Sequence, residues 1–236
     1  MEINLSELIF LDIETVCCAP TYQDLSPRLQ EHWSKKSGLI NQEKDPAELF
    51  FDKAGIYAEF GKIIVISVGR LYINQEKELA FKTKTLSGHD EHALLSDFKS
   101  IIEKYPSDKL TMVAHNGMEF DFPYLCRRML INGIKIPNVL NLSGKKPWEI
   151  KHIDTLNYWK FGDRKNYTSL DLLAAVFDIP GSKDDIDGSM VSEVYYRQNN
   201  LERIATYCSK DVWVTAMLYL KLNQISLPKT ENIVFY

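Results

Sequence analysis

The sequence is poor in cysteine, and the cysteines that it has are not spaced for a metal site or a disulfide framework. Among 236 residues the four cysteines form no CxxC pair and no paired zinc-ligand spacing. Cys17 and Cys18 are adjacent, which is a poor arrangement for a structural disulfide. The pattern predicts a reduced cytoplasmic protein whose cysteines serve as small core residues.

Long apolar runs are also missing. No run approaches the roughly 20 residues that a membrane-spanning helix needs, and Asp12 and Glu14 interrupt the run that begins at Leu8. The N-terminal residues lack a basic segment followed by an apolar one, so we expect neither a secretory signal nor a membrane partner.

The chain has no excess of positive charge. Its 28 Lys and Arg residues against 32 Asp and Glu residues give a net charge of −4. Non-specific nucleic-acid binding depends on many basic side chains that neutralise phosphates, so a general basic coat is excluded. A nucleic-acid enzyme with a local basic rim and bound cations remains compatible with this charge.

What is present is the pattern of a globular α/β protein. Apolar residues make up 45% and charged residues 25%, which is ordinary for a packed domain. The pattern predicts one domain over residues 1–236, with a mixed central β-sheet flanked by helices. An insertion of loops and short helices is expected at about 17–60, where the periodicity is weaker. Expected strands are 7–15, 63–72, 78–83, 109–115 and 150–154; expected helices are 89–105, 123–133, 169–177 and 201–222, the last one capped by Asn200.

Two carboxylates interrupt the first predicted strand. Side chains two residues apart in a strand point to the same face, so Asp12 and Glu14 lie side by side. Burying both without partners costs several kcal/mol per ion as an order of magnitude. A hard cation such as Mg²⁺ explains the pair, because it binds carboxylates together with phosphate oxygens. The alternative is an edge strand with one polar face.

Two further segments of the sequence contain acidic residues that are candidates for a functional site. Tyr207 and Asp211 are four residues apart in the last predicted helix and therefore share a face; the alternative is a core tyrosine beside a half-exposed aspartate. Asp121 precedes a predicted helix, and taken alone it is better explained as a helix cap. It nevertheless follows Asn116 at the end of a strand, where α/β sheets bind ligands.

These three segments together resemble the motifs of the DEDD superfamily of 3′–5′ exonucleases, whose fold is ribonuclease H-like. Residues 11–15 (LDIET) resemble the first motif, residues 116–121 (NGMEFD) the second, and residues 207–211 (YCSKD) the third motif of the tyrosine subclass, DEDDy. Residues 152–155 and 167–186 extend the likeness to the exonuclease domain of family B DNA polymerases and to stand-alone bacterial proteins related to it. The resemblance runs from about residue 6 to 222, without 17–60. No polymerase domain fits in the remaining length.

The resemblance implies a metal-dependent exonuclease that hydrolyses single-stranded DNA from its 3′ end and releases nucleoside 5′-monophosphates. Two divalent ions, Mg²⁺ or Mn²⁺, are expected as cofactors. It implies that Asp12 bridges both ions, that Glu14 and Asp211 hold the ion that activates water, and that Asp121 supports the second ion. Tyr207 is expected to orient the attacking water, because a phenol with a pKa of about 10 is a poor base at neutral pH.

The resemblance also implies contacts with the substrate. Thr15 and Val16 are expected to meet the 3′ sugar, and Asn116 and Phe120 the penultimate region, although Phe120 fits a core position equally well. Lys183 resembles a lysine that approaches the scissile phosphate; the alternative is a solvated charge beside Asp184 or Asp185. Basic residues near aromatic ones suit a single strand, but a solvated loop explains them too; these are Lys145, Lys146, Lys160, Arg164 and Lys165, near Trp148, Trp159 and Tyr167.

Two other functions remain open. The same fold could trim RNA, since only the shape of the sugar pocket distinguishes the 2′-hydroxyl of RNA. The chain could also be a non-catalytic binding module for nucleic acid or protein. A missing acidic residue would favour that reading, and none of the four is missing.

Overall fold

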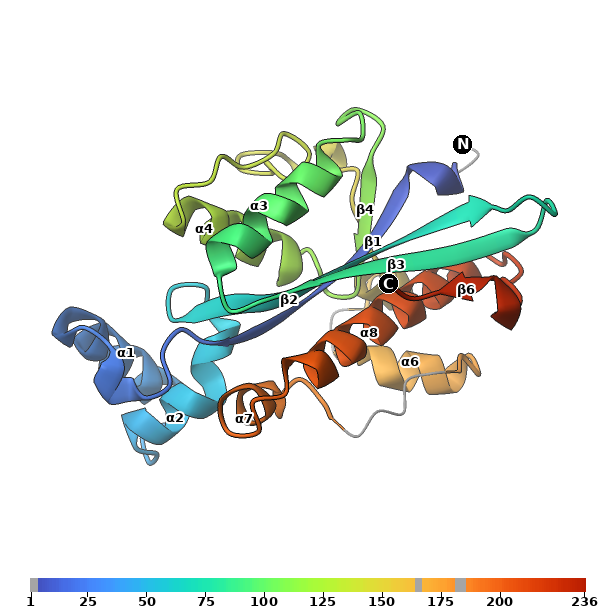
Figure 1. The fold of residues 1–236 in the computed structure, drawn as a ribbon. Helices are drawn as coiled ribbons and strands as arrows, with labels where there is room; N and C mark the ends of the chain where they lie inside the picture. Colours follow the sequence, from blue (N-terminus) through green and yellow to red (C-terminus); the bar gives the residue numbers. More distant parts are fainter. Residues whose placement is uncertain (1–3, 164–166, 181–185) are drawn as a thin grey trace.

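The structure is a computed structural model that describes residues 4–163, 167–180 and 186–236. Its centre is a mixed six-stranded sheet with the order β5-β4-β1-β2-β3-β6 (Figure 1). Strand β1 runs antiparallel to β2 and parallel to β4, so the predicted mixed sheet is confirmed. The strands are β1 (Leu8–Cys17), β2 (Gly61–Ile73), β3 (Leu79–Ser87), β4 (Thr111–Ala114), β5 (Ile153–Asp154) and β6 (Ile233–Val234).

Helices cover both faces of this sheet. On one face α3 (Glu91–Ile102) and α4 (Asp121–Ile131) pack Phe98 and Phe122 against Leu11 and Ile13 of β1. On the other face the long helix α8 (Leu201–Leu222) crosses the sheet, next to α6 (Leu170–Val176) and α7 (Val191–Tyr196) (Figure 1). The ring of Phe10 meets Tyr219 of α8 at a centroid distance of 5.7 Å.

The alternation along β1 sets the position of its two acids. Leu11 and Ile13 are buried toward α3 and α4, so Asp12 and Glu14 point to the other face, toward α8. Because β1 is paired with β2 on one side and β4 on the other, it is an interior strand. The alternative of an edge strand with a polar face is therefore excluded.

Residues between β1 and β2 form a small helical unit with its own core. Its elements are the 3₁₀ turns Tyr22–Asp24 and Ala54–Ile56 and the helices α1 (Pro27–Ile40) and α2 (Pro46–Lys53), each with proline in its first turn. Trp33 is fully buried between Phe50 and Phe60, and its Nε1 donates to the Pro46 carbonyl at 2.7 Å. These helices lie at one end of the sheet (Figure 1).

Several predicted elements differ from those observed. Helix α8 begins and ends where expected, and the Asn200 side chain caps it. The strand expected at 150–154 is only Ile153–Asp154, because a 3₁₀ turn (Pro147–Glu149) with its C-cap at Ile150 lies before it; α5 (Thr155–Lys160) follows it. Helix α7 and strand β6 were not predicted. All four cysteines are free, and within the described residues no helix is both long and apolar enough to span a membrane.

Candidate active site

Strand β1 supplies two carboxylates to one side of the sheet. Ligand atoms of Asp12, Glu14 and Cys208 all lie within 4.8 Å of one another, and Glu14 is 8% exposed. The pairing of β1 with β2 shifts register between Glu14 and Thr15. Such an irregularity re-aims side chains at the point where the strand leaves the acidic cluster.

Helix α8 faces these carboxylates with three side chains, those of Tyr207, Cys208 and Asp211. The Tyr207 hydroxyl lies near Asp211, one turn further along the helix, and burial, followed by the Asp211 carboxylate, raises the pKa of Tyr207. The Cys208 thiol donates to Asp12 Oδ2 at 3.2 Å. Burial and the nearby Asp12 raise the pKa of Cys208 well above its ordinary value, so this group remains a protonated donor at neutral pH.

Asp121 reaches the same place from the first residue of α4. Strand β4 pairs with β1 only as far as Phe10, and beyond that point the Ile13 backbone lies close enough to the Asp121 carboxylate to offset part of the rise in pKa that burial causes. The Asp121 side chain is 3% exposed, and its Oδ1 has no hydrogen-bond partner. The alternative of a helix cap does not account for this geometry, since the capping position is Phe120 and carries no side-chain cap.

The pKa values of these groups record how closely the four carboxylates lie. Burial first, and then the charges of Glu14, Asp121 and Asp211, raise the pKa of Asp12 well above its ordinary value. Burial followed by Asp211 and Asp121 does the same for the pKa of Glu14. Burial raises the pKa of Asp121 to about 7, with Asp154 and Asp211 adding to the shift. Like charges held this closely disfavour full ionisation.

This donor set fits a divalent cation. Hard cations take carboxylate oxygens, and the unpaired Oδ1 of Asp121 is a buried acceptor without a donor. A cation would also remove the mutual repulsion that raises the carboxylate pKa values. Cys208 fits less well as a ligand, because its thiol stays protonated and already donates to Asp12.

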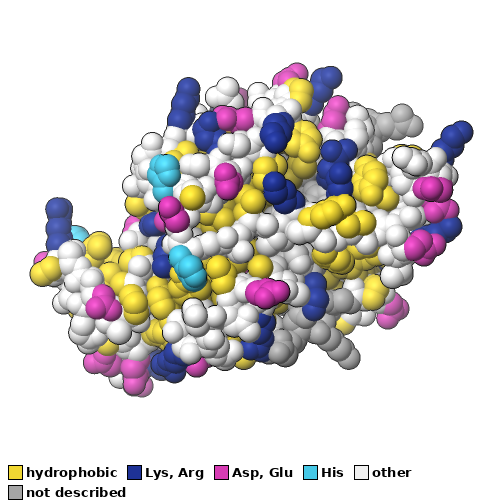
Figure 2. Space-filling view, in the orientation of Figure 1, with side chains coloured by type: hydrophobic (Ala, Val, Ile, Leu, Met, Phe, Trp, Pro, Cys, Tyr) yellow, Lys and Arg dark blue, Asp and Glu magenta, His cyan; other side chains and the backbone are white. Residues whose placement is uncertain are grey.

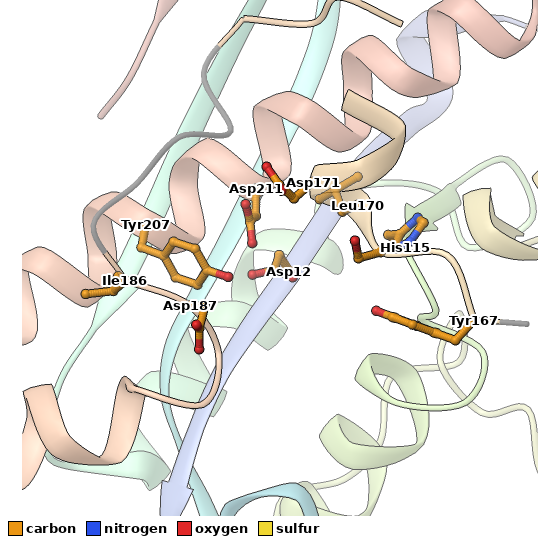
Figure 3. A pocket seen from close by; sticks show the side chains of 10 residues that line it. Asp12, His115, Tyr167, Leu170, Asp171, Ile186, Asp187, Tyr207 and Asp211 are labelled. Atoms are coloured by element: carbon orange, nitrogen blue, oxygen red, sulfur yellow. The ribbon is translucent and has the colours of Figure 1, made fainter. Parts of the chain in front are cut away.

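A cleft of about 690 Å³ opens beside this cluster, a size in the usual range of ligand sites. In Figure 3 the side chains of Asp12, Asp211 and Tyr207 are directed toward one another, and the Tyr167 hydroxyl enters from the opposite wall. The charges of Asp121, Asp154, Asp211 and Asp12 add to burial in raising the pKa of Tyr167.

His115 fixes that opposite wall. Its two ring nitrogens lie 2.9 Å from Thr155 Oγ1 and 3.0 Å from the Thr168 carbonyl. Since the carbonyl can only accept, Nε2 carries the proton in this network. Burial lowers the pKa of His115, so the ring is a neutral bridge between β4 and the segment that carries Tyr167.

The turn after β4 depends on another carboxylate, Asp154. Its two oxygens accept from the backbone amides of Asn116 and Met118, each at 3.0 Å, and Oδ1 also accepts from Leu156. Asn116 has a left-handed φ of 62°, a conformation that asparagine tolerates better than most residues. Asp154 thus holds the turn that leads to Asp121.

The remaining predicted substrate residues lie at the far end of β1 and at the start of α4. The Thr15 hydroxyl donates to the Gly55 carbonyl at 2.8 Å. The Val16 side chain is fully buried beside Ile64 and Val191, so only its backbone is available to a ligand. Phe120 is half-buried and its ring lies 5.3 Å from that of Tyr124. Lys183 lies outside the described residues.

Four residues of the site were not singled out from the sequence as site residues: His115, Tyr167, Cys208 and Asp154. Asp154 and Tyr167 stand in segments that carry the family resemblance, so a signal existed for both. Nothing in the sequence distinguishes Cys208 from a core cysteine, because its contact is with a strand 196 positions away.

Comparisons with known proteins identify the family. Residues 56–231 match the family described as "Predicted 3'-5' exonuclease related to the exonuclease domain of PolB". The chain belongs to this family. The matched region includes Asp121, Tyr207 and Asp211 of the exonuclease-like site, whereas Asp12 and Glu14 precede it, and it is the fold that brings those two residues to the cluster.

Two archaeal DNA polymerases are similar to this exonuclease-related chain. A DNA polymerase of Pyrococcus glycovorans is 26% identical in an alignment of 209 residues, and the match covers 75% of this chain and 25% of the polymerase. The structure of the family B DNA polymerase from Pyrobaculum calidifontis superposes with a TM-score of 0.55 and 16% identity, over 92% of this chain and 24% of that one. The likeness confirms the ribonuclease H-like fold. The chain spans about a quarter of the length of both relatives.

Proposed function

We propose that this protein is a divalent-metal-dependent 3′–5′ exonuclease that removes nucleotides from the end of single-stranded DNA and releases nucleoside 5′-monophosphates. One observation carries the proposal: four carboxylates from three separate elements meet beside a cleft, and the pKa values of Asp12, Glu14 and Asp121 are raised there. The family membership supports the exonuclease class, and the two similar polymerases favour DNA.

Each carboxylate has a proposed part in holding cations. Asp12 would contact both ions, Glu14 and Asp211 one of them, and Asp121 the other, through its unpaired Oδ1. Two divalent ions, Mg²⁺ or Mn²⁺, would supply an activated water and neutralise charge on the phosphate oxygens. The Cys208 thiol holds the Asp12 carboxylate in place by its hydrogen bond to Oδ2.

Tyr207 would act as a hydrogen-bond donor. Burial and the charges of Asp211, Glu14 and Asp12 raise its pKa far above the ordinary value, so the hydroxyl keeps its proton at neutral pH. A group of this kind cannot take a proton from water, but it can orient one. The hydroxyl lies near the Asp211 carboxylate, and an attacking water between the two would accept its hydrogen bond.

The substrate strand would enter the cleft between Tyr207 and Tyr167, which stand on opposite walls (Figure 3). Backbone groups of Thr15 and Val16 would meet the terminal sugar, and Asn116 and Phe120 would hold the next nucleotide. Lys183 would stabilise charge on the phosphate. RNA is the alternative substrate, distinguished by its 2′-hydroxyl.

The decisive experiment uses strands of DNA and RNA labelled at the 5′ or the 3′ end, incubated with Mg²⁺, Mn²⁺ or EDTA. The proposal expects stepwise shortening of 5′-labelled DNA, immediate release of label from the 3′ end as a mononucleotide, and no reaction in EDTA. Shortening from the 5′ end, or equal activity in EDTA, would contradict it. Faster degradation of RNA than of DNA would instead identify RNA as the substrate.

A further inference from the structure

A second hollow lies on the face of the sheet that is remote from the acidic cleft. Its volume is about 370 Å³. In the space-filling view dark blue side chains gather around yellow ones near the end of α3 and the adjoining part of β2 and β3 (Figure 2). We call it the basic groove; its cationic members are Arg70, Lys82, Lys84 and Lys104, and two tyrosines, Tyr105 and Tyr236, also line it.

The sheet itself separates this groove from the cleft. The groove is floored by Ile9 and Val68, which belong to the core packed under α3 and α4. Asp12 and Glu14 point to the opposite face, toward α8. Whatever binds in the groove therefore cannot touch the carboxylates directly.

The cations of the basic groove are placed against one another. Arg70 and Lys82 are direct cross-strand partners in the pairing of β2 with β3, and like charges in that arrangement repel. None of the described residues that line the groove is acidic. Glu103 of the nearby helix end is held by Lys99 at 2.5 Å.

Arg70 adds a second, independent observation. Its Nε is buried and has no hydrogen-bond partner, and a buried donor without an acceptor is unfavourable. The packing of the groove thus leaves both a repulsion and an unsatisfied donor, and the negative charge of an anionic ligand in the groove would relieve the repulsion.

We propose that the basic groove binds the phosphodiester backbone of a single-stranded nucleic acid. The ligand class follows from the chemistry: repeated phosphates match a row of cations, and bases can stack on the exposed ring of Tyr236 and the half-buried ring of Tyr105. Because the whole chain has a charge of −4, attraction to a polyanion has to come from a local cluster of this kind. The inference rests on the proposed function for the biological role of the groove, whereas the binding experiment does not depend on that function.

The groove would act as a tether for long substrates. A strand held on the far face keeps its 3′ end near the protein between successive cleavages, whereas a trinucleotide is too short to reach both places. The groove should therefore affect the KM for long strands and leave the turnover of a trinucleotide unchanged.

The test compares wild type with the triple variant Arg70→Gln, Lys82→Gln, Lys84→Gln. Binding of fluorescent oligo-dT and oligo-U is measured in EDTA, where no hydrolysis occurs, at several salt concentrations. We expect the variant to bind at least about tenfold more weakly at moderate salt and its salt slope to fall by about two, since each lost phosphate contact removes about 0.7 from that slope. Thermal stability should be equal or higher, because the like-charge pair is gone.

The matched control is Lys44→Gln, Lys53→Gln, Arg127→Gln, which removes the same charge from other exposed positions. Equal loss of binding in the control and groove variants would overturn the proposal, as would unchanged binding in the groove variant. Displacement of the oligonucleotide by polyglutamate at equal charge concentration would instead assign the groove to an acidic protein. If wild type proves inactive on every strand, the proposed function fails while the binding result still decides the groove.

Discussion

Asp12 is a carboxylate surrounded by other carboxylates, and that position makes its charge both costly and useful. Replacing it with asparagine keeps the shape but removes one of four negative charges. We expect Asp12→Asn to reduce hydrolysis by several orders of magnitude, since a shared cation ligand is lost. In EDTA the melting temperature should rise, because the repulsion of Asp12 by Glu14, Asp121 and Asp211 is then removed.

The control for this change is Asp97→Asn, an exposed position on α3. Rates are measured on 5′-labelled single-stranded DNA with Mg²⁺, and melting by circular dichroism with EDTA. Hydrolysis at the control's rate by Asp12→Asn would remove Asp12 from the cation site.

A change at the Tyr207 hydroxyl tests whether this group orients the attacking water or binds a metal ion. Tyr207→Phe keeps the ring and loses only the hydroxyl that lies near Asp211. We expect turnover to fall by about 10- to 1000-fold, the scale of one positioned hydrogen bond, while Mn²⁺ affinity by calorimetry changes little. The control is Tyr158→Phe, which removes a hydroxyl that lies 3.4 Å from Asn223 Oδ1. A large loss of Mn²⁺ affinity in Tyr207→Phe would place the hydroxyl among the metal ligands.

At the scale of elements, the Gly55 carbonyl is one of the contacts that join the helical unit after β1 to that strand. Gly55 O accepts from both Thr15 Oγ1 and the Tyr124 hydroxyl, at 2.8 and 2.7 Å. A methyl group on Gly61 would overlap the Tyr124 hydroxyl and lie 2.8 Å from Gly55 O. We expect Gly61→Ala to destabilise the protein by about 1–3 kcal/mol, the usual cost of overpacking.

The same unit offers the control. Gly38 lies in α1, and a methyl group there meets nothing within 4 Å. Gly38→Ala should stabilise by about 0.5–1 kcal/mol, because glycine is unfavourable inside a helix. Urea unfolding measures both. Equal stability of Gly61→Ala and wild type would mean that Tyr124 can move away without cost.

The elements that the sequence predicts well are those defined by local pattern. Helix α8 has a sustained apolar face and an asparagine cap, both of which are readable along the chain. Helix α7 has six residues, too few for a periodic pattern to stand out. The helices between β1 and β2 could be expected only as short helices, because their core is made by Trp33, Phe50 and Phe60 from three distant segments.

The same distinction holds for the site. Motif spacing identifies which acids matter, but the contacts that hold them are long-range: Asp121 with the Ile13 backbone, Cys208 with Asp12, and Asp154 with the turn at Asn116. None of these pairs shares a local pattern. They become visible only when β1, β4 and α8 are placed together.

For the whole molecule, the acidic cluster links stability to pH. Burial raises the pKa of Asp121 to about 7, above the value of about 3.9 for an unfolded aspartate. The folded state therefore binds the proton more tightly, and the stability due to this proton is complete below about pH 4 and is lost as the pH rises through about 7. Asp12 and Glu14 shift in the same direction.

Two histidines act in the opposite sense, and the experiment has to remove their effect. Burial lowers the pKa of His115 and of His152, so their contribution rises with pH up to about 6.5. Both are present in wild type and in Asp121→Asn, and they cancel when the two proteins are compared at each pH.

The last prediction is the difference in melting temperature between Asp121→Asn and wild type, measured in EDTA from pH 4 to pH 8.5. Near pH 4 Asp121 is protonated and resembles asparagine, so the difference should be near zero. It should become positive as the pH rises and level off above about pH 8, where Asp121 is ionised. Mn²⁺ should stabilise wild type more at pH 8 than at pH 5, and Asp121→Asn less than wild type, because the cation neutralises the charges that repel. A difference that is independent of pH would show that Asp121 titrates normally and does not lie in the cluster.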